Sequence, residues 1–493
     1  MVRGADPEEG SPSDSTQPMS DSSAEQIPSP EANRPKESLY ATIAAREEEL
    51  WQAALDIWKW AEPGYHETRS SQRLQGLLHD AGFKVSAGIA EIPTAFVAEF
   101  GSGEPVIALL GEFDALPGLA QDAVPYRSTE TPDAYGHACG HHLFGVASAG
   151  AAIAIAEEIK AGRIQGTIRY YGCPAEEGGA AKAFMVLAGA FQGCDVVLHW
   201  HPSNRNAAGA RSSLARIAVR FQFKGAPAHA AGAPEEGRSA LDAVALTNHA
   251  AELLREHIPD SARIHYVITN GGQAPNIVPE TAEVYYYVRH FDADVVKRLY
   301  DRLLLCAKAG ALATETELVV DYEGGIVNLL PNLALSEVIE KNLKQLNDLK
   351  YTEEEQLFAV KLQESLLKQE PISDIREVYD LSGIVGPGST DVGDVSWNVP
   401  TAGFNTACWV PGTPAHSWQA TACGGTSIAR KGMHLAMKTL VASAWDLYQN
   451  PELIAAAKRE FKERTARQSY QTLMQPDQKP ALDYRQLPAD SMH

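Results

Sequence analysis

The sequence predicts an α/β protein in which an open, mixed but largely parallel sheet is interrupted by an inserted ferredoxin-like α+β domain. Between about residues 84 and 200, short apolar strands alternate with helical stretches, which is the pattern of parallel strands joined by crossover helices. Near residue 210 the pattern changes to strands of alternating apolar and polar residues, in the order β-α-β-β-α-β. These observations indicate one α/β domain that is split by a second domain.

The composition is that of a globular, acidic protein. The chain has 493 residues, of which 44% are hydrophobic and 21% are charged, and its formal net charge is −21. This length suffices for a large core. A negative charge without a basic stripe argues against nucleic acid or an anionic membrane as a partner. Six cysteines in a chain of this length are too few for a disulfide scaffold.

The sequence contains no obvious targeting segment. The most apolar run, residues 145–156, ends at Glu157 and is shorter than the roughly 18 residues that a membrane span needs. The N-terminal residues have no apolar stretch of the kind found in secretory signals. We therefore expect a cytoplasmic location.

The first and last parts of the expected α/β domain are residues 39–209 and 325–455. Residues 1–38 are rich in Ser, Pro and acidic residues and are expected to be a disordered tail. Residues 456–493 are polar and are expected to be a second tail. Between these tails the periodicity predicts helices over 39–61, 67–81, 144–160, 335–368 (two helices) and 427–449, and strands over 84–89, 95–100, 106–113, 167–172, 195–200 and 401–410.

The inserted domain is expected over residues 210–324. Its elements are predicted as strands over 215–224, 263–269, 281–289 and 316–322, with helices over 238–257 and 293–313. Alternation in these strands indicates an antiparallel sheet with one solvated face. The second of the two helices in 335–368 opens with Thr352 and Glu355, in the spacing of a capping box.

Five short motifs place acidic, thiol or imidazole side chains at strand ends or in glycine-rich loops. They are GEFDALP (111–117), GHACGHH (136–142), PAEEGG (174–179), LHWHP (198–202) and PGTPAHSW (411–418). Each motif alone is weak, because a histidine in a loop is more often a surface residue than a metal ligand. All five follow predicted strands of one sheet, so their side chains can converge at one edge.

Two of these motifs carry closely spaced candidates. Cys139 and His141 lie two residues apart and would point to the same side of an extended chain, so both could reach one metal ion. Glu176 and Glu177 are adjacent carboxylates that would diverge in a glycine-rich turn. One could bind a metal ion while the other takes a proton from the attacking water, whose pKa a divalent ion lowers towards ~7. A solvated acidic turn is the alternative.

The remaining candidates come from three other strand ends. His199 and His201 are both possible ligands, and His201 is preferred because it lies closer to the carboxyl end of its strand. His416 follows a Pro-Gly turn and could close the site from the far side. Asp114 ends another strand, where an oriented carboxylate suits a partner of a ligand histidine.

Taken in order, these motifs resemble a known family. HACGH, PAEEGG, WHP, GAPAHAAGAP, NGGQAPNIVP and the late HSW are similar to the metal-dependent aminoacylase and carboxypeptidase G superfamily of amidohydrolases. Within it, residues 40–450 most resemble the branch of the p-aminobenzoyl-glutamate, hippurate and auxin-conjugate hydrolases. The helices over 335–368, followed by GSTDVGDVSW, favour the p-aminobenzoyl-glutamate type. The resemblance implies a zinc-exopeptidase-like fold.

The resemblance also implies roles for individual residues. It implies two divalent metal ions, Mn²⁺ or Zn²⁺, with Glu176 as the general base and His229 of the inserted domain stabilising the oxyanion, often from a partner subunit. Asn276 and Arg289 match positions that contact the substrate. A homodimer formed through the inserted domain is implied as well, with a small amide as substrate. The implied metal ligands are Cys139, His141, Glu177, His201 and His416.

One departure from the family and three alternatives remain open. His142 stands where many relatives have an aspartate, which could alter the surroundings of the metal or the choice of substrate. Hydrolysis of an amide between an acyl or aroyl group and an amino acid is the leading hypothesis. A dipeptidase, an aryl-amine C–N hydrolase and a metal-binding homologue without catalysis are the alternatives. A serine hydrolase is disfavoured because the sequence has no GxSxG elbow.

Overall fold

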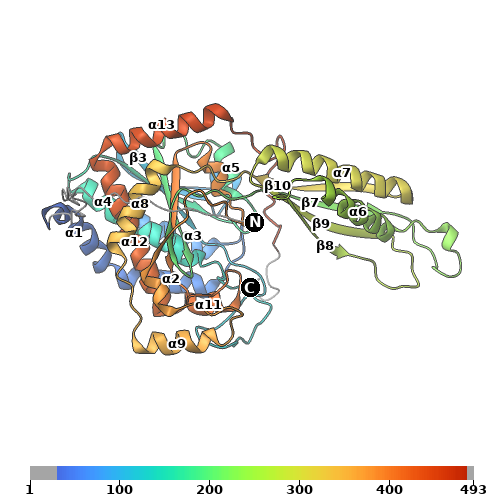
Figure 1. Ribbon diagram of the computed structural model, residues 1–493, viewed down its shortest axis with the longest axis horizontal. Coiled ribbons are helices and arrows are strands. Elements are labelled where there is room, and N and C mark those ends of the chain that lie inside the picture. Colours follow the sequence, from blue (N-terminus) through green and yellow to red (C-terminus); the bar gives the residue numbers. More distant parts are fainter. Residues whose placement is uncertain (1–29, 486–493) are drawn as a thin grey trace, which may run out of the picture.

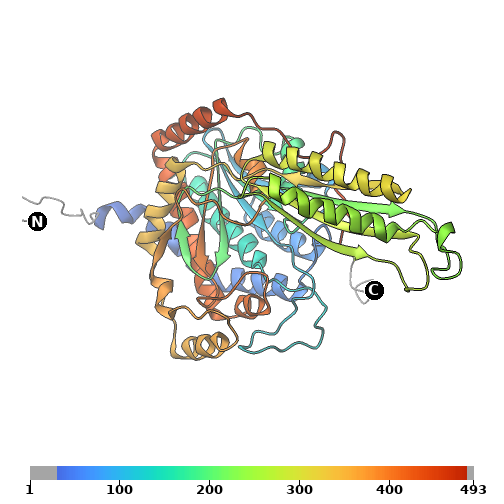
Figure 2. The same cartoon turned by 45° about the vertical axis from the view of Figure 1, so that its right-hand side comes forward.

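A computed structural model describes residues 30–485, and it contains two sheets, each packed against its own helices (Figure 1). The larger sheet has eight strands in the order β1-β2-β4-β3-β5-β12-β6-β11, and the smaller has four in the order β10-β7-β9-β8. Figure 2 shows the smaller sheet and its two helices extending away from the rest of the molecule. Most of the tail expected over 1–38 lies outside the described residues, but helix α1 (Pro30–Ala45) begins before Ser38.

The larger sheet is mixed, with four parallel and three antiparallel pairs of strands, which confirms the predicted mixed α/β sheet. β3 pairs in parallel with β4 and β5, and β12 pairs in parallel with β5, whereas β2 is antiparallel to both β1 and β4. Every residue of β3 is buried, as expected for a strand with both faces covered. The strands are β1 (Lys84–Ala87), β2 (Phe96–Ser102), β3 (Val106–Glu112), β4 (Gly166–Cys173), β5 (Val196–Ser203), β6 (Asn206–Ala208), β11 (Val378–Asp380) and β12 (Thr401–Ala407).

Helices cover both faces of this sheet. α4 contacts β3, β4 and α12, and it is apolar on all sides because it is enclosed. It is the one helix in the described residues that is long and apolar enough to span a membrane, yet 89% of its apolar window is buried inside the protein. The helices are α2 (Glu47–Trp60), α3 (Thr68–Asp80), α4 (His141–Lys160), α5 (Ala181–Leu187), α8 (Leu333–Leu346), α9 (Glu353–Gln363), α10 (Val392–Ser396), α11 (Trp418–Gly424), α12 (Ser427–Gln449) and α13 (Pro451–Arg467).

Three predictions about helices and the regions beside them can be compared directly with the structure. The single helix expected over 39–61 was wrong: two helices, α1 and α2, meet at Arg46. The capping box at the start of α9 is confirmed, because the Thr352 hydroxyl and the Glu355 carboxylate each accept a hydrogen bond from the other residue's backbone N–H. Residues 456–467, expected in a polar tail, belong to α13 instead.

The smaller sheet has the β-α-β-β-α-β order that the sequence predicted. Its neighbouring strands are all antiparallel, and α6 and α7 pack on one face over a core that includes Phe221 and Tyr286. The opposite face is open, so side chains there alternate with the buried ones. The elements are β7 (Ala215–Lys224), α6 (Ala240–Leu254), β8 (Arg263–Asn270), β9 (Thr281–His290), α7 (Ala293–Thr314) and β10 (Glu317–Ile326).

After α13, residues 468–485 form a C-terminal strap along the junction between the two parts of the molecule (Figure 1). Tyr322 of β10 donates a hydrogen bond to the carbonyl of Leu473 (2.6 Å), so the strap is attached to the smaller sheet. At its far end, the Tyr484 ring packs edge-on against Tyr65, with 5.5 Å between centroids. The strap therefore links the smaller sheet to loops of the larger one.

Candidate metal centre

The carboxyl ends of the large sheet's central strands bring the predicted ligands together. The ligand atoms of Cys139, His141 and His201 lie within 4.8 Å of one another, and so do those of Cys139, Glu177 and His416. Cys139 belongs to both groups. Five residues that span almost three hundred positions of the sequence thus form two adjoining sets of three possible ligands, which share one sulfur.

The loop before α4 positions Cys139 and His141. The expectation of an extended chain was wrong here, because Gly140 has a left-handed φ of 74° and His141 is the first residue of α4. A Cβ at Gly140 would lie 2.8 Å from a side-chain carbon of Pro202, so glycine is required both for the turn and for the close approach of β5. The Cys139 Sγ lies 3.4 Å from His201 Nε2.

His201 presents one nitrogen to this cluster. Its Nδ1 lies 2.7 Å from the Pro202 carbonyl and donates to it, which leaves Nε2 as an acceptor facing Cys139. Burial, together with the charge of His141, lowers the pKa of His201 to about 3, so the imidazole is neutral as a metal ligand must be. His199, the other candidate, is in neither group, and its ring lies against Gly403 of β12.

Asp114 connects the two halves of the cluster. Its Oδ1 accepts a hydrogen bond from His141 Nδ1 (2.7 Å), and its Oδ2 accepts one from the backbone N–H of Glu177 (2.9 Å). Asp114 is 1% exposed. Because Nδ1 is occupied, His141 can offer only Nε2 to a metal ion. Burial opposes ionisation of Asp114, but the charge of His141 and the hydrogen bonds from His141 and Glu177 together outweigh it and lower the pKa of the carboxyl.

His416 reaches the cluster from the loop after β12. Its backbone N–H donates to the carbonyl of Ala138 (3.0 Å), which ties this loop to the one that carries Cys139. His416 has a left-handed φ of 57°, a conformation that costs energy in a residue with a side chain. Its Nε2 lies 3.0 Å from Glu177 Oε1. It is the most exposed member of the two groups.

The turn with Glu176 and Glu177 is held from behind by two residues that the sequence analysis missed. The buried carboxylate of Glu67 accepts a hydrogen bond from the N–H of Ala175 (2.8 Å), and Tyr65 donates to the carbonyl of Gly179 (2.6 Å). The strap adds a third support, because Arg485 donates to the carbonyl of Glu177 (2.8 Å).

The pKa values of the two carboxyls in this turn are shifted in opposite directions. Burial, and then the charges of Glu112 and Glu177, raise the pKa of Glu176 well above its ordinary value. Burial also opposes ionisation of Glu177, but the close contact with the His416 ring and the charge of His141 together outweigh it and lower the pKa of Glu177. The pair thus offers one ionised ligand beside one carboxyl with a raised affinity for protons, as the divergent-turn hypothesis requires.

The orphaned atoms of the cluster fit a metal ion. His141 Nε2 lies 3.1 Å from Glu112 Oε2, and Glu177 Oε1 lies 3.0 Å from His416 Nε2, but these three buried atoms have no hydrogen bond of normal geometry within residues 30–485. Such atoms are rare in folded proteins, and an unseen ion is one explanation for them. Burial raises the pKa of the Cys139 thiol well above its ordinary value, so this sulfur becomes a thiolate only when a cation binds it.

A buried ion-pair network lies behind the cluster, and the sequence analysis did not find it. Lys182 of α5 is fully buried, and its Nζ lies 2.8 Å from Glu112 and 2.5 Å from Asp391. The other oxygen of Glu112 lies 3.1 Å from His141 Nε2. Glu112, His141 and Glu176 form a third group of possible ligands. Lys182 pairs with both Glu112 and Asp391 and so offsets part of their negative charge beside the proposed metal centre.

His142, the residue that departs from the family pattern, faces away from the ligand groups. Its Nε2 lies 3.0 Å from the Gly424 carbonyl, and its ring packs 4.9 Å from that of His137. Burial lowers the pKa of His142 to about 3. It is therefore a neutral, buried residue that hydrogen bonds to the backbone, and none of the three ligand groups includes it.

The three predicted residues of the inserted domain do not join the cluster. His229 and Asn276 are exposed in neighbouring loops at the outer end of the smaller sheet, where the N–H of Ala230 donates to the Asn276 carbonyl (3.0 Å). Arg289 lies at the other end of that sheet, on β9, with its guanidinium over the ring of Tyr287. The structure of one chain thus separates the two groups of predicted substrate contacts.

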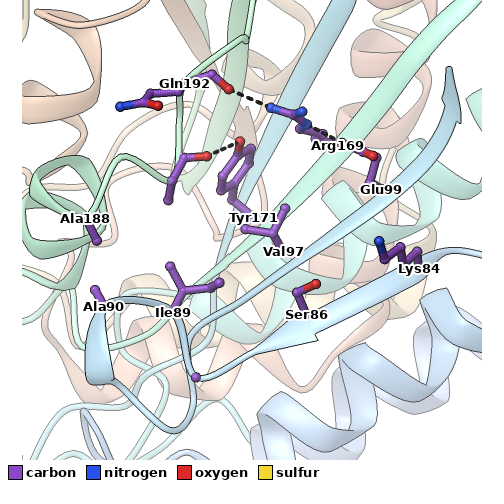
Figure 3. Close-up of a pocket in the computed structure, with 12 residues that line it drawn as sticks. Lys84, Ser86, Ile89, Ala90, Val97, Glu99, Arg169, Tyr171, Ala188 and Gln192 are labelled. Atoms are coloured by element: carbon purple, nitrogen blue, oxygen red, sulfur yellow. Dashed lines mark hydrogen bonds and ion pairs between the residues drawn. The ribbon is translucent and has the colours of Figure 1, made fainter. Parts of the chain in front are cut away.

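The pocket in Figure 3 is not the candidate site. It lies at the edge of the large sheet, has a volume of about 480 Å³ and is lined by residues of β1, β2 and β4. Two of its charged side chains are already paired, because Arg169 donates to Glu99 (2.6 Å) and also to the carbonyl of Gln192 (2.9 Å). None of the predicted ligands lines it.

Comparisons with known proteins agree with this geometry. The model of peptidase family M20/M25/M40 matches residues 108–477. A p-aminobenzoyl-glutamate hydrolase subunit of Escherichia coli strain K12 is 38% identical over 456 residues, which are 87% of this chain and 95% of that protein. The Xaa-Arg dipeptidase of Mus musculus is 30% identical over 430 residues, 84% of this chain and 89% of that protein.

Solved structures have the same fold at lower identity. The crystal structure of a dinuclear metal-binding peptidase of the M20 family from Bacillus subtilis aligns with a TM-score of 0.56, at 16% identity, and covers 82% of this chain and 99% of its own. At this identity the likeness concerns the fold alone.

Proposed function

Because the chain belongs to peptidase family M20/M25/M40, we propose that it is a metal-dependent amidohydrolase that cleaves the amide between an acyl or aroyl group and an amino acid. One observation carries this proposal. Two adjoining ligand groups share Cys139 at the carboxyl edge of the sheet, and Glu176 stands beside them without a place in either. A metal centre with a spare carboxyl is the arrangement that hydrolysis of an amide by water needs.

The ligands of the two proposed ions are Cys139, His141, Glu177, His201 and His416. When bound, the ions would supply Lewis acidity to the amide carbonyl and to the attacking water. A thiolate ligand favours Zn²⁺, whereas the resemblance to this branch favours Mn²⁺, so the donor set alone does not choose the metal.

The chain's own residues perform the proton transfers in this proposal. Glu176 takes the proton of the attacking water, because its raised pKa makes it a stronger proton acceptor than an ordinary carboxylate. It then returns the proton to the nitrogen of the leaving amino acid. Asp114 fixes the ring of His141 and the backbone of Glu177, so both ligands are oriented before substrate binds.

We propose that the chain forms a homodimer through the inserted domain, residues 210–324, and that His229 acts in the site of the partner copy. β8 is an edge strand, and its side chains Tyr266, Val267 and Ile268 are 39–54% exposed, which leaves an apolar edge free to pair. His229 and Asn276 are exposed and lie apart from the cluster of their own chain. From the partner copy, His229 would hold the oxyanion and Asn276 would contact the substrate.

Mixing two inactive variants tests the shared site. H229A and E176Q are each expected to be inactive as homodimers, whereas a mixed dimer contains one site with both native residues. Exchange of subunits should therefore restore part of the activity. Two variants that stay inactive when mixed, although mass spectrometry finds the mixed dimer, would reject the shared site, and light scattering that finds a monomer would reject the dimer itself.

A dipeptidase is the second candidate, because a relative that is 30% identical is an Xaa-Arg dipeptidase. The two functions differ only in the acyl half and in the amino acid that is released. Hydrolysis of an aryl amine would release ammonia, and a product analysis separates it from both.

The decisive experiment combines metal analysis with a substrate panel. The protein, reconstituted with Mn²⁺ or Zn²⁺, is assayed on p-aminobenzoyl-glutamate, N-benzoyl and N-acetyl amino acids and dipeptides ending in arginine, and free amino acid is measured. Release of amino acid from the aroyl substrates is expected. A metal-loaded protein that cleaves none of the panel would overturn the amidohydrolase proposal, and one that cleaves only dipeptides would favour the second candidate.

A further inference from the structure

The C-terminal strap, residues 468–485, is packed into both parts of the molecule. Leu473 and Met474 are neighbours in the sequence, yet Leu473 (8% exposed) belongs to the hydrophobic core of the smaller sheet and Met474 (6% exposed) to that of the larger one. A tail that merely lay on the surface would leave such side chains in solvent. The strap is therefore fixed at the junction by burial of apolar side chains on both sides.

β10 is shaped to receive the start of the strap. Its register with β7 shifts between Tyr322 and Gly324, and Gly324 has a φ of 132°, which a residue with a side chain rarely adopts. A Cβ at Gly325 would lie 2.6 Å from the Cβ of Leu473, so a side chain there would displace the strap. The hydrogen bond from Tyr322 to the Leu473 carbonyl (2.6 Å) completes this attachment.

The other end of the strap fits the turn that contains Glu177. A Cβ at Gly64 would overlap the Tyr484 hydroxyl, and one at Gly178, whose φ is 122°, would lie 3.1 Å from the Tyr484 ring. Arg485 follows and donates to the carbonyl of Glu177 (2.8 Å). Glycines thus make room for the strap at both of its ends, which indicates that its position is a designed feature of the fold.

Arg485 stands between three parts of the chain. Besides its hydrogen bond to the turn, its guanidinium interacts electrostatically with Tyr135, in the loop that leads to Cys139, and with Tyr287 of β9 in the smaller sheet. A guanidinium has five N–H donors in a rigid fork, so one arginine can serve several partners at once. The last described residue of the chain therefore faces the metal-binding turn, the neighbouring ligand loop and the inserted domain.

The strap is also tied to the point at which the chain leaves the inserted domain. Val327 directly follows β10, and its backbone N–H donates to Asp394 Oδ2 (3.2 Å). The Tyr470 hydroxyl of the strap donates to the other oxygen of the same carboxylate (2.8 Å). One buried aspartate of the larger part thus holds both the connection to the inserted domain and the beginning of the strap.

We propose that the strap is a tether through which the inserted domain holds the turn containing Glu177 in place, so that Arg485 is a positioning residue for this metal ligand. The inference rests on the metal centre of the proposed function and adds a control on it. Displacement of β10 from the larger sheet would pull on Arg485 and shift the backbone of Glu177. Metal affinity then depends on contacts at β10, which contains none of the ligands.

Metal affinity, measured without substrate by competition with a chromogenic chelator, tests the positioning role. We expect R485M to bind metal about tenfold more weakly than wild type, because the Glu177 carbonyl loses its charged donor, and R485K to restore most of the affinity. K479M, which breaks an exposed ion pair between the same strap and Glu91, is the matched control and should stay within about twofold of wild type. Equal affinities of R485M and wild type would overturn the role of Arg485.

A double-mutant cycle tests the tether itself. Y322F removes the hydrogen bond that attaches Leu473 to β10 but changes no ligand, and we expect it to weaken metal binding about threefold. Losses at independent sites multiply, whereas a second break in one tether adds nothing. The variant with both changes should therefore bind metal as R485M does. Wild-type affinity in Y322F, or a combined loss equal to the product of the single losses, would overturn the tether.

Hydrogen exchange of the metal-free protein gives a readout that needs neither metal nor substrate. The amides of residues 175–178 should exchange faster in Y322F and R485M than in wild type and K479M, while circular dichroism shows that all four are folded. Unchanged exchange in Y322F and R485M would reject the tether. Faster exchange with weaker metal binding, in a protein whose wild type cleaves no amide, would support the tether and overturn only the proposed function. A wild-type protein that binds no metal would overturn both.

Discussion

Asp114 accepts a hydrogen bond from His141 Nδ1 at 2.7 Å, and both side chains are buried. This contact decides which nitrogen of His141 can reach a cation, because Nδ1 is no longer available. The second oxygen of Asp114 holds the backbone of Glu177, so one carboxylate orients a ligand in each of the two groups.

Replacing Asp114 by Asn should weaken metal binding without removing a ligand. The amide has one donor end and no charge, so it cannot support both contacts of the carboxylate. Loss of such a supporting partner typically costs about 10- to 100-fold in metal affinity. Competition with a chromogenic chelator measures this. D122N, which changes an exposed carboxylate, is the control, and an equal affinity of D114N and D122N would contradict the role of Asp114.

The shared sulfur predicts an unequal effect of ligand mutations on metal content. Cys139 belongs to both groups, whereas His201 and His416 belong to one each. After dialysis, H201A and H416A should each retain about one ion per chain, and C139A should retain none. Elemental analysis, combined with the protein concentration, measures the number of metal ions per chain. If C139A kept one full equivalent, the two groups would not depend on a common ligand.

Glu176→Gln should separate metal binding from turnover. The amide keeps the shape of the side chain but cannot take a proton, and proton transfer by a placed side chain typically contributes about 10²- to 10⁴-fold. We expect kcat to fall by at least ~100-fold while metal content stays at the wild-type level. E177Q serves as the comparison, because it should lose metal as well as activity. Wild-type turnover by E176Q would exclude this residue as the base.

Lys182→Met should destabilise the fold strongly. The side chain of Lys182 is fully buried between Glu112 and Asp391, and its removal leaves Asp391 without a charged partner and Glu112 with His141 alone. Removing one partner of a buried ion pair costs about 3–5 kcal/mol. Chemical denaturation measures this change. The control is K361M at the exposed pair with Glu364, where a change of at most about 1 kcal/mol is expected; equal losses in both variants would refute the argument.

The buried carboxyl of Asp394 should make the protein less stable as the pH rises. Burial raises its pKa to about 7, against the opposing hydrogen bond from Tyr470. The folded protein therefore binds this proton more tightly than the unfolded chain, whose aspartate titrates near 4. The stabilisation is complete below pH ~4 and is lost between about pH 4 and 7, by up to about 1.4 kcal/mol for each pH unit.

Asp394→Asn isolates this contribution from the other titrating groups. The amide does not ionise, so the stability of D394N relative to wild type should increase as the pH is raised from 5 to 8. Thermal or chemical unfolding at pH 5 and at pH 8 gives the difference in stability between D394N and wild type at each pH. A difference between the proteins that is the same at pH 5 and pH 8 would show that this carboxyl has an ordinary pKa in the folded state.

The smaller sheet could be predicted from the sequence because one of its faces is open. Along β9, buried residues such as Val284 and Val288 alternate with partly exposed ones such as Tyr285, and this period of two is visible in the sequence. Helix α13 was missed for the opposite reason. Only Ile454 and Ala457 are buried in it, so its apolar stripe is too short to distinguish it from a polar tail.

The motifs were enough to place the ligand residues at one edge of the large sheet. They were not enough to identify the buried residues that hold the ligands in position. Glu112 sits at the end of an apolar strand, and Lys182 lies in a short helix, where a lysine is ordinarily a surface residue. Only the packing of α5 against α10 brings Lys182 to Asp391, far along the chain. Glu67 was missed likewise, because its partner Ala175 is distant in sequence.

The strap that ends at Arg485 has a practical consequence for anyone who expresses this protein. Purification handles and trimmed boundaries are commonly put at a chain's end on the assumption that it is remote from the chemistry. In this fold, residues so close to the terminus touch the backbone of a proposed metal ligand. A preparation shortened before Tyr484 could therefore look inert for reasons unrelated to its substrate, and a handle is better fused in front of α1.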